Sequence, residues 1–224
     1  ILVLRAEHEL VTGLRRKIAA FCNVSPEAVV QSLDQPTIYE VPLRMQEQGL
    51  DATILLKLDM PVGETPGLGP WRSFLDRRHK ATEIINIGLV GKYDLQDAYK
   101  SILEALSQAG TYNDRKVKCH FINSEKIDNT TVADKLAGMD GYVICPGFGQ
   151  RGIEGKIIAA QYCREHNKPT FGICLGMQMM VIEFGRNVLG YSDANSVEMD
   201  NKTAHNVIDL MEDQKNITNM GGTM

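Results

Sequence analysis

The stretch "TFGICLGMQMM", residues 170–180, decides how the second half of this chain folds. Its first residues are apolar and predict a buried strand, whereas the run after Cys174 has the apolar spacing of a helix. Gly172 and Gly176 flank the cysteine at two-residue spacing, and residues without a side chain allow a tight bend. The sequence therefore predicts a strand, a sharp turn at Cys174 and a helix.

Strand and helix patterns alternate around this stretch from residue 83 onward. Strand patterns cover 83–91, 116–123, 140–144 and 168–174, and helical patterns cover 95–110, 131–139, 152–167 and 176–190. In the first of these helices Ile102, Leu103 and Leu106 face inward, and Gly110 is expected as the C-cap. Because strands joined by helices pair in parallel, this order predicts an α/β fold with a doubly wound, mostly parallel sheet.

The first 82 residues follow a different pattern. A strand is expected at 1–5, a helix from the spacing of Leu10, Leu14, Ile18 and Phe21, a short helical turn at Pro26, and an amphipathic piece over 37–58. The run "DMPVGETPGLGPW", residues 59–71, is dense in Pro and Gly, and a basic segment interpreted as a solvated helix follows it. We therefore predict one domain part at 1–60, an interdomain linker at 61–82 and a second domain at 83–224.

Composition limits the classes of function. The chain has 224 residues and a net charge of −4, with its Lys and Arg scattered, so no nucleic-acid surface is indicated. No apolar run approaches the roughly 20 residues that would span a bilayer, and no signal segment opens the chain. The five cysteines contain no Cys-x-x-Cys pair, which indicates reduced cytoplasmic thiols rather than disulfides or zinc. Because the chain starts inside a strand pattern and stops at a turn pattern, we expect a piece of a longer enzyme.

Cys174 is the candidate nucleophile. The pattern Gly172-x-Cys174-x-Gly176 has the spacing of a nucleophile elbow with Cys in place of Ser, where side chains at the flanking positions would collide with backbone. The helix that follows would lower the pKa of the thiol through its dipole, and the Leu175 amide would face a developing oxyanion. The alternative is that Cys174 is a small buried hydrophobic residue, as free cysteines often are.

The turn "PGFGQRG", residues 146–152, is the second candidate site element. It also spells the glycine fingerprint of a dinucleotide site, but the next strand ends in Cys174 instead of the acidic residue that such a site needs. The sequence "GIEGK" is no phosphate loop either, because Ile157 stands where Ser or Thr is required. We therefore interpret the turn as an oxyanion hole opposite Cys174, led by the Gly147 amide. A thiolate with an oxyanion hole indicates acyl transfer.

Acyl transfer by a thiol also requires a general base. Downstream of Cys174 the chain offers one histidine, His205, in a segment predicted to form a loop. The favoured interpretation of His205 is an ordinary loop residue, and we expect the base beyond Met224.

Several longer sequence motifs resemble those of a known family. "GICLGMQ" after "PGFGQRG" resembles the class I glutamine amidotransferases. Taken with "GLVGKY", "PGFGQRGIEGK", "ANSVEMD", "HNVIDLMEDQK" and "GGTM", and with "RRKIAAFCNV" and "TIYEVPL" near the start, the chain resembles the CTP synthase family from end to end. The resemblance implies the C-terminal part of a synthetase domain at 1–60 and a glutamine amidotransferase domain, incomplete at its C-terminus, at 83–224.

The resemblance also implies residue roles. Cys174 would form the glutamyl thioester, with oxyanion amides from Gly147 and Leu175. The glutamine site would comprise Gly147, Leu175, Gly176, Met177, Gln178 and Glu198, with the Glu198 carboxylate facing the α-ammonium. In the synthetase part, Lys17 would lie near the UTP or CTP phosphates, Gln35 beside the ATP adenine and Arg5 near ATP. A solvated helix residue is the alternative for Lys17.

Family membership implies an activity and its partners. The expected enzyme is a ligase of pyrimidine biosynthesis that aminates UTP to CTP with ATP and ammonia from L-glutamine. It would use Mg²⁺ with ATP, with metal ligands outside this segment, GTP as allosteric activator and CTP as feedback inhibitor. It would be a cytoplasmic homotetramer. Two alternatives stay open: another class I glutamine amidotransferase, and a non-catalytic regulatory or filament scaffold with the same fold.

The chain departs from the family pattern in places. Pro146 stands where many relatives carry a glycine, which removes one possible amide donor. The stretch between Tyr93 and Leu95 is one residue shorter than the family form, which leaves the local loop open to question. The family's phosphate loop, its metal carboxylates and its His and Glu partners of the cysteine are expected outside residues 1–224.

Overall fold

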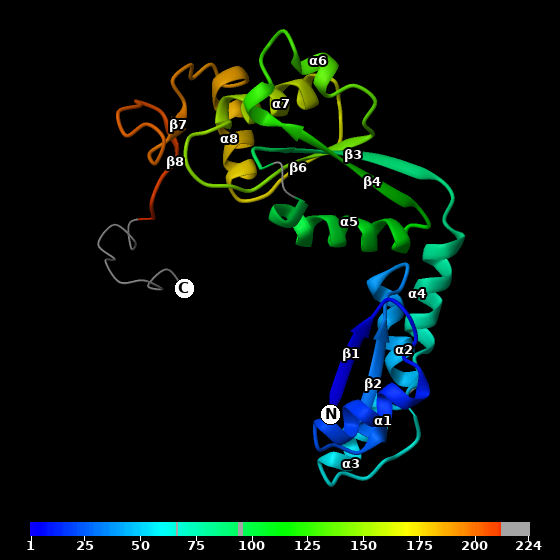
Figure 1. The fold of residues 1–224 in the computed structure, drawn as a ribbon. Coiled ribbons are helices and arrows are strands. Elements are labelled where there is room, and N and C mark those ends of the chain that lie inside the picture. The colour runs from blue at the N-terminus through cyan, green and yellow to red at the C-terminus, as the bar shows by residue number, and fades with distance from the viewer. Residues whose placement is uncertain (66, 94–95, 212–224) are drawn as a thin grey trace. The chain divides into compact units, whose positions relative to one another are not determined.

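The computed structural model describes residues 1–65, 67–93 and 96–211 and divides the chain into two compact units, Ile1–Lys80 and Ala81–Met224. Figure 1 shows the elements of each unit. The shortened spacing between Tyr93 and Leu95 and the C-terminal words after Met211 lie outside the described residues. Within the described ranges no helix is long and apolar enough to cross a membrane.

The first unit is built on a two-stranded parallel sheet. Strand β1 (Leu2–Ala6) pairs with β2 (Val29–Leu33), and helix α1 (Thr12–Phe21) connects them. A 3-10 turn follows at Pro26–Ala28, as its proline predicts. The amphipathic piece forms a second 3-10 turn (Ile38–Glu40), α2 (Val41–Glu47) and α3 (Leu50–Lys57). The N-terminal part is thus α/β, as the strand and helix patterns indicate.

Helix α4 (Gly69–Lys80) occupies the second half of the predicted linker and has one packed face. Leu75 is buried, the Trp71 indole Nε1 donates to the Tyr39 carbonyl oxygen at 2.7 Å, and the Phe74 ring meets the Tyr39 ring edge-on at 5.3 Å. The opposite face of the helix is polar and exposed. The boundaries of the linker at 61 and 82 stay a prediction.

The second unit contains a four-stranded parallel sheet in the order β4-β3-β5-β6. Its strands are β3 (Ile84–Gly91), β4 (Lys116–Asn123), β5 (Gly141–Ile144) and β6 (Thr170–Gly172). From β3 the chain first moves outward to β4 and then returns to the other side of β3 for β5 and β6. The strand order therefore reverses between β3 and β5, which confirms the doubly wound parallel sheet.

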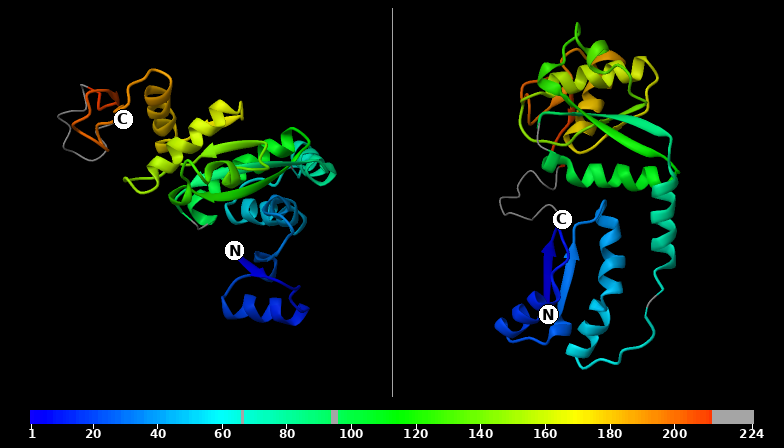
Figure 2. Two further views of the ribbon diagram at one scale, coloured as in Figure 1. Left: turned by 90° about the horizontal axis from the view of Figure 1, so that it is seen from above. Right: turned by 45° about the vertical axis from the view of Figure 1, so that its right-hand side comes forward.

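Helices cover both faces of this sheet (Figures 1 and 2). Helix α5 (Lys100–Tyr112), after a 3-10 turn at Gln96–Tyr99, lies on one face, where its inward residues pack with Leu89, Val143 and Cys145. Helices α7 (Ile153–Glu165) and α8 (Leu175–Asn187) lie on the other face, where Ala159 and Cys163 pack with Val90, Tyr142 and Ile144. Alternate residues of β5 thus enter opposite cores, as a strand buried on both faces requires.

Shorter elements complete the second unit. A 3-10 turn (Ser124–Lys126) and α6 (Val132–Lys135) lie between β4 and β5. After α8 the chain forms a separate pair of short parallel strands, β7 (Asn195–Ser196) and β8 (Asn206–Ile208).

Gly110 is not a C-cap, so the sequence prediction for it is wrong. Helix α5 continues to Tyr112 and Asn113 caps it. A Cβ atom on Gly110 would lie 2.7 Å from a Val117 methyl carbon and 2.9 Å from the Arg115 carbonyl oxygen. The glycine is therefore needed because the helix crosses closely over the chain that leads into β4.

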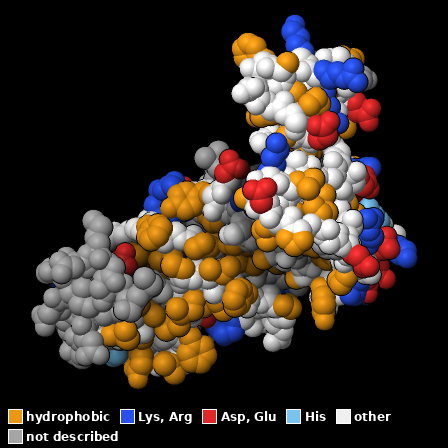
Figure 3. All heavy atoms as spheres, turned by 90° about the horizontal axis from the view of Figure 1, so that it is seen from below, with side chains coloured by type: hydrophobic (Ala, Val, Ile, Leu, Met, Phe, Trp, Pro, Cys, Tyr) orange, Lys and Arg blue, Asp and Glu red, His pale blue; other side chains and the backbone are white. Residues whose placement is uncertain are grey.

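The outer edge of β6 borders an apolar groove of about 490 Å³. Its walls come from β6, α8 and β8 and include Phe171, Met177, Val181, Phe184 and Leu189. Figure 3 shows the broad area of hydrophobic side chains on the face of the molecule seen from below.

Candidate active site

Cys174 lies on a strained turn between β6 and α8. It is the N-cap residue of α8, with φ 53° and ψ −115°, and its side chain is exposed. This backbone conformation is unfavourable for any residue with a Cβ atom, and such strain gathers at functional sites. The predicted turn is confirmed, and the exposed thiol is not the small buried residue of the alternative interpretation.

The two flanking glycines are required by space. A Cβ atom on Gly176 would lie 1.9 Å from the Ile144 carbonyl oxygen, and one on Gly172 would lie 2.7 Å from the backbone nitrogen of Met177. Neither position tolerates a side chain without movement of backbone. The steric reason predicted for the Gly-x-Cys-x-Gly spacing is therefore confirmed.

The turn after β5 lies beside this elbow, because β5 and β6 are neighbours in the sheet. The Ile173 amide donates to the Ile144 carbonyl oxygen at 3.0 Å, which carries the strand pairing up to Cys174. Gly147 is buried, and a Cβ atom on it would lie 3.5 Å from the Leu175 side chain. The structure thus brings Gly147 and Leu175, the two predicted amide donors, to the same end of the sheet as Cys174.

Two buried lysines support the turn after β5. Lys156 on α7 is fully buried, and its Nζ donates to the carbonyl oxygens of Cys145 at 2.6 Å and Pro146 at 3.5 Å. Lys92, which follows β3 and is 4% exposed, donates to the carbonyl oxygens of Phe148 and Gly149. Burial lowers the pKa of Lys156 from 10.5 to about 8. Sequence reasoning missed both lysines; the one available signal was that Lys156 stands between apolar residues on the buried face of α7.

The remaining predicted glutamine-site residues lie on the first turn of α8 and on the loop after β7. Gly176 is buried, Gln178 is half-buried and Met177 is exposed in the first turn of α8. Glu198 is exposed on the loop after β7. That loop is tied to the β5 turn because the Gln150 side chain donates to the Met199 carbonyl oxygen at 3.1 Å, and Met199 packs on the cluster that contains Leu175.

His205 is engaged within its own loop. Its Nδ1 lies 2.6 Å from an Asp193 carboxylate oxygen, and its ring stacks on Tyr191 at 4.3 Å. This hydrogen bond lowers the pKa of Asp193 to about 2. None of the contacts among the described residues joins His205 to Cys174, which agrees with its interpretation as a loop residue.

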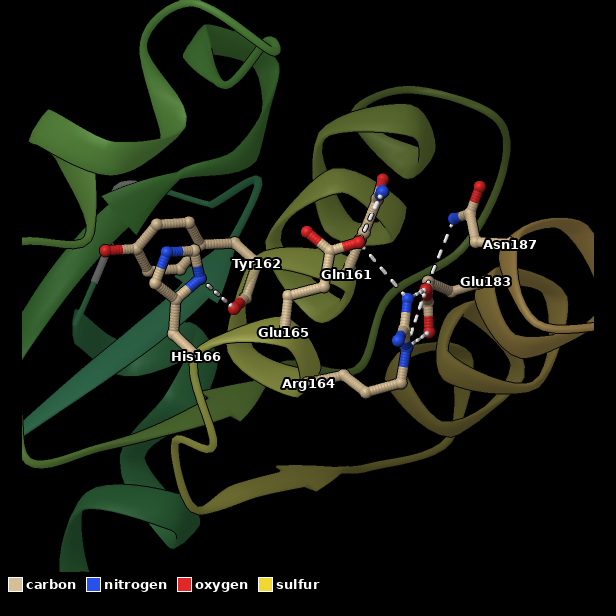
Figure 4. A network of polar contacts seen from close by, with 7 residues as sticks. All are labelled: Gln161, Tyr162, Arg164, Glu165, His166, Glu183 and Asn187. Atoms are coloured by element: carbon tan, nitrogen blue, oxygen red, sulfur yellow. Dashed lines mark hydrogen bonds and ion pairs between the residues drawn. The ribbon is translucent and has the colours of Figure 1, made fainter.

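A polar network joins α7 to α8 (Figure 4). Arg164 donates through Nε and Nη2 to the carboxylate of Glu183, with the shortest contact at 2.8 Å, and Asn187 donates to the same carboxylate at 3.2 Å. Glu183 is 2% exposed, so this charge pair and its hydrogen bonds fix α8, the helix that Cys174 precedes as N-cap residue.

Comparison with known proteins places this geometry in a family. The family model for class-I glutamine amidotransferases matches residues 94–224, and the model for the CTP synthase N-terminus matches residues 1–60. The chain belongs to the CTP synthase family. CTP synthase of Bacteroides thetaiotaomicron is 71% identical over 226 aligned positions, and that of Porphyromonas gingivalis strain W83 is 56% identical over 225.

The alignments also show how much of a CTP synthase is present. Both relatives align with 100% of this chain, which spans 42% of their own length. A solved structure, the glutaminase domain of Trypanosoma brucei CTP synthase with bound acivicin, is similar with a TM-score of 0.56 and 38% identity. That similarity covers 59% of this chain and 52% of the solved chain.

Two of the three predicted nucleotide-binding residues in the part that matches the CTP synthase N-terminus lie together. Arg5 and Gln35 line one hollow of about 420 Å³ at the carboxyl ends of β1 and β2. Arg5 pairs with Asp34 at 3.1 Å, and the Gln35 amide donates to the carbonyl oxygens of Leu33 and Asp34. Lys17 is exposed on α1 and does not line that hollow.

A CTP synthase would use magnesium together with ATP. Across residues 1–65, 67–93 and 96–211, no three His, Cys, Asp or Glu side chains gather as a metal site would need. No step is therefore derived through the metal.

Proposed function

We propose that this chain serves a glutamine-dependent CTP synthase, a ligase that forms a C–N bond. In the proposed reaction ATP phosphorylates the 4-oxygen of UTP, and ammonia released from L-glutamine displaces the phosphate to give CTP. The described residues contribute the ammonia-producing half of this chemistry and one edge of the nucleotide-binding half.

Glutamine hydrolysis begins in this proposal with attack by the Cys174 sulfur on the side-chain carboxamide carbon. The carbonyl oxygen becomes an oxyanion that accepts hydrogen bonds from the amides of Gly147 and Leu175. Collapse of the intermediate breaks the C–N bond, expels ammonia and leaves a glutamyl thioester, which water hydrolyses to glutamate. The proton of the thiol passes to a general base and from it to the leaving ammonia. We expect that base in the part of the enzyme outside this chain.

Recognition of glutamine falls to the surroundings of the elbow. Gln178 and the backbone of Gly176 and Met177 lie in the first turn of α8, close to Cys174 in the chain. Glu198 offers an exposed carboxylate for the α-ammonium group, on a loop that Gln150 ties to the oxyanion turn.

The observation that carries this proposal is the exposed Cys174 at φ 53° between two glycines that exclude any Cβ atom. The test is covalent labelling of the full-length protein with acivicin, followed by peptide mass spectrometry. We expect one adduct on Cys174, none in Cys174→Ala, and unchanged labelling in Cys22→Ala, which removes the other exposed thiol. Labelling that survives in Cys174→Ala contradicts the proposal. A non-catalytic scaffold would take up no label in either protein.

Nucleotide binding by the N-terminal unit belongs to the same proposal. Arg5 and Gln35 would contact ATP, which would bring Mg²⁺ held by residues outside this chain, and Lys17 would contact the UTP or CTP phosphates. GTP activation, CTP inhibition, a homotetrameric assembly and a cytoplasmic location are further parts of it. We expect Lys17→Ala to raise the KM for UTP about tenfold, because one charge contact to phosphate is worth about 1.4 kcal/mol. Steady-state kinetics will test this, with acivicin labelling of Cys174 as the unaffected control.

A further inference from the structure

The two buried lysines beneath the turn after β5 have no carboxylate partner among the described residues. Neither Lys92 nor Lys156 lies within ion-pair distance of a carboxylate there, and their hydrogen bonds run to backbone carbonyl oxygens. A buried, unpaired ammonium group is costly, and burial is the main cause that lowers the pKa of Lys156. A simple packing role does not explain why an ammonium group, rather than an apolar side chain, occupies this place.

The carbonyl groups that the lysines hold determine where the amides of the turn point. No peptide bond in the described chain is cis, and in a planar trans peptide the N–H points opposite to the C=O. The Pro146 carbonyl oxygen lies 3.5 Å from the Lys156 ammonium nitrogen, next to the 2.6 Å contact of that nitrogen with the Cys145 carbonyl oxygen. The N–H of Gly147, which belongs to the same peptide as the Pro146 carbonyl, therefore points away from Lys156. Lys92 holds the next part of the turn through Phe148 and Gly149 in the same manner.

Gly147 itself lies against both lysines. A Cβ atom on this residue would be 3.2 Å from Cε of Lys92 and 3.6 Å from Nζ of Lys156. The space beside the α-carbon of Gly147 is therefore filled by the two lysine side chains together with the Leu175 side chain, 3.5 Å away.

We propose that Lys156 is a positioning residue for glutamine hydrolysis, whose ammonium group fixes the Pro146–Gly147 peptide so that the Gly147 amide meets the oxyanion. Lys92 supports the same turn from the Phe148 side. This inference rests on the proposed glutaminase function and adds the residues that build its oxyanion hole.

The test compares Lys156→Met with the wild type in the full-length protein. We expect kcat for glutamine hydrolysis to fall about 100-fold, the effect of losing one oxyanion donor, with KM for glutamine within about threefold. Affinity for an aldehyde analogue of glutamine, which forms a tetrahedral adduct with Cys174, should fall by the same factor. Alkylation of Cys174 by iodoacetamide creates no oxyanion and should keep its rate within about twofold.

Lys168→Met is the matched control. The exposed Lys168 ammonium group also donates to a backbone carbonyl oxygen, that of Met139, at 3.3 Å. Met139 precedes β5, whereas the carbonyl groups that Lys156 holds follow β5. We expect this variant to keep wild-type values in all three measurements. If Lys156→Met fails to fold by circular dichroism, Lys92→Met carries the test, with the same pattern and a loss of about tenfold.

The outcomes separate the two claims. Unchanged kcat and analogue binding in Lys156→Met overturn the inference, and so does a loss of alkylation as large as the loss of turnover, because the lysine would then act on the thiol. A wild-type protein that neither hydrolyses glutamine nor reacts with acivicin refutes the proposed function, and the inference with it.

Discussion

The two turns at the carboxyl ends of β5 and β6 are neighbours, yet they hold their shapes by opposite means. The elbow at Cys174 is fixed by exclusion, because the space beside Gly172 and Gly176 is already filled by backbone. The turn after β5 is fixed by attraction, because the Lys92 and Lys156 ammonium groups hold its carbonyl oxygens. The elbow therefore depends on residues without a side chain, and the turn after β5 depends on buried ammonium groups.

This difference means that the two turns should fail differently. Steric exclusion does not depend on pH or salt. A side chain introduced at one of the flanking glycines would displace the backbone. A buried ammonium group titrates, and its loss leaves the backbone free to rotate.

Gly176→Ala should destabilise the fold most, by about 4 kcal/mol or more, because its Cβ atom would lie 1.9 Å from the Ile144 carbonyl oxygen. The midpoint of urea unfolding, measured at pH 7 and at pH 9, should fall equally at both. A loss below about 1 kcal/mol would show that the elbow can shift and would contradict the steric account.

Lys156 should give the fold a pH dependence that Lys156→Met lacks. Its pKa is about 8 in the folded protein against 10.5 ordinarily, so between these values the unfolded state binds more protons. Stability of the wild type relative to the variant should therefore rise with pH across that window, by about 3 kcal/mol in total. Unfolding curves from pH 7 to 10.5 will measure it. Parallel stability profiles would contradict the burial of a charged Lys156, and Lys168→Met should keep the wild-type slope.

Glu183→Gln should cost about 2 kcal/mol, because the carboxylate accepts charge-assisted hydrogen bonds from Arg164 while buried. These contacts join the two helices that follow the two turns (Figure 4). Glu154→Gln is the control, since Glu154 pairs with Arg186 with 62% of its side chain exposed and should cost under about 0.5 kcal/mol. Equal losses in the two variants by thermal unfolding would contradict this ranking.

Gly149→Ala should have the smallest effect, about 1 kcal/mol. Gly149 has φ 69° in the turn after β5, but no atom lies within 4 Å of the place of its Cβ. The cost is therefore backbone conformation alone, without collision. Thermal unfolding of both variants compares the two losses of stability directly. A loss in Gly149→Ala as large as that in Gly176→Ala would contradict the difference between the two turns.

Much of the fold was predictable because its signals are local. The alternation of apolar strands and amphipathic helices predicted the parallel sheet, and Gly172 and Gly176 predicted the elbow, since in each case the physical cause lies within a few residues. Gly110 was misinterpreted because a glycine near a helix end usually caps it. Its real constraint, contact with Val117 and the Arg115 carbonyl, comes from the chain packed against it.

The lysines of the site could not be predicted for a related reason. A lysine in a helix is normally exposed, and only the crossing of α7 under the β5 turn creates a place where Lys156 meets carbonyl oxygens. Glu198 was assigned to the site only through the family resemblance, because its sequence position indicates no more than a loop. The hydrogen bond that ties this loop to the turn, from Gln150 to Met199, joins residues 49 positions apart.

The backbone conformation of Cys174 lowers the stability of the fold at the residue that the proposed reaction requires. The pair φ 53°, ψ −115° is the mirror image of an ordinary extended residue, so glycine would adopt it without penalty. A protein carrying Cys174→Gly should then melt at a higher temperature than its parent, by an amount that reflects about 1–3 kcal/mol, while producing no ammonia. Selection for thermal stability alone would therefore favour glycine over cysteine at position 174.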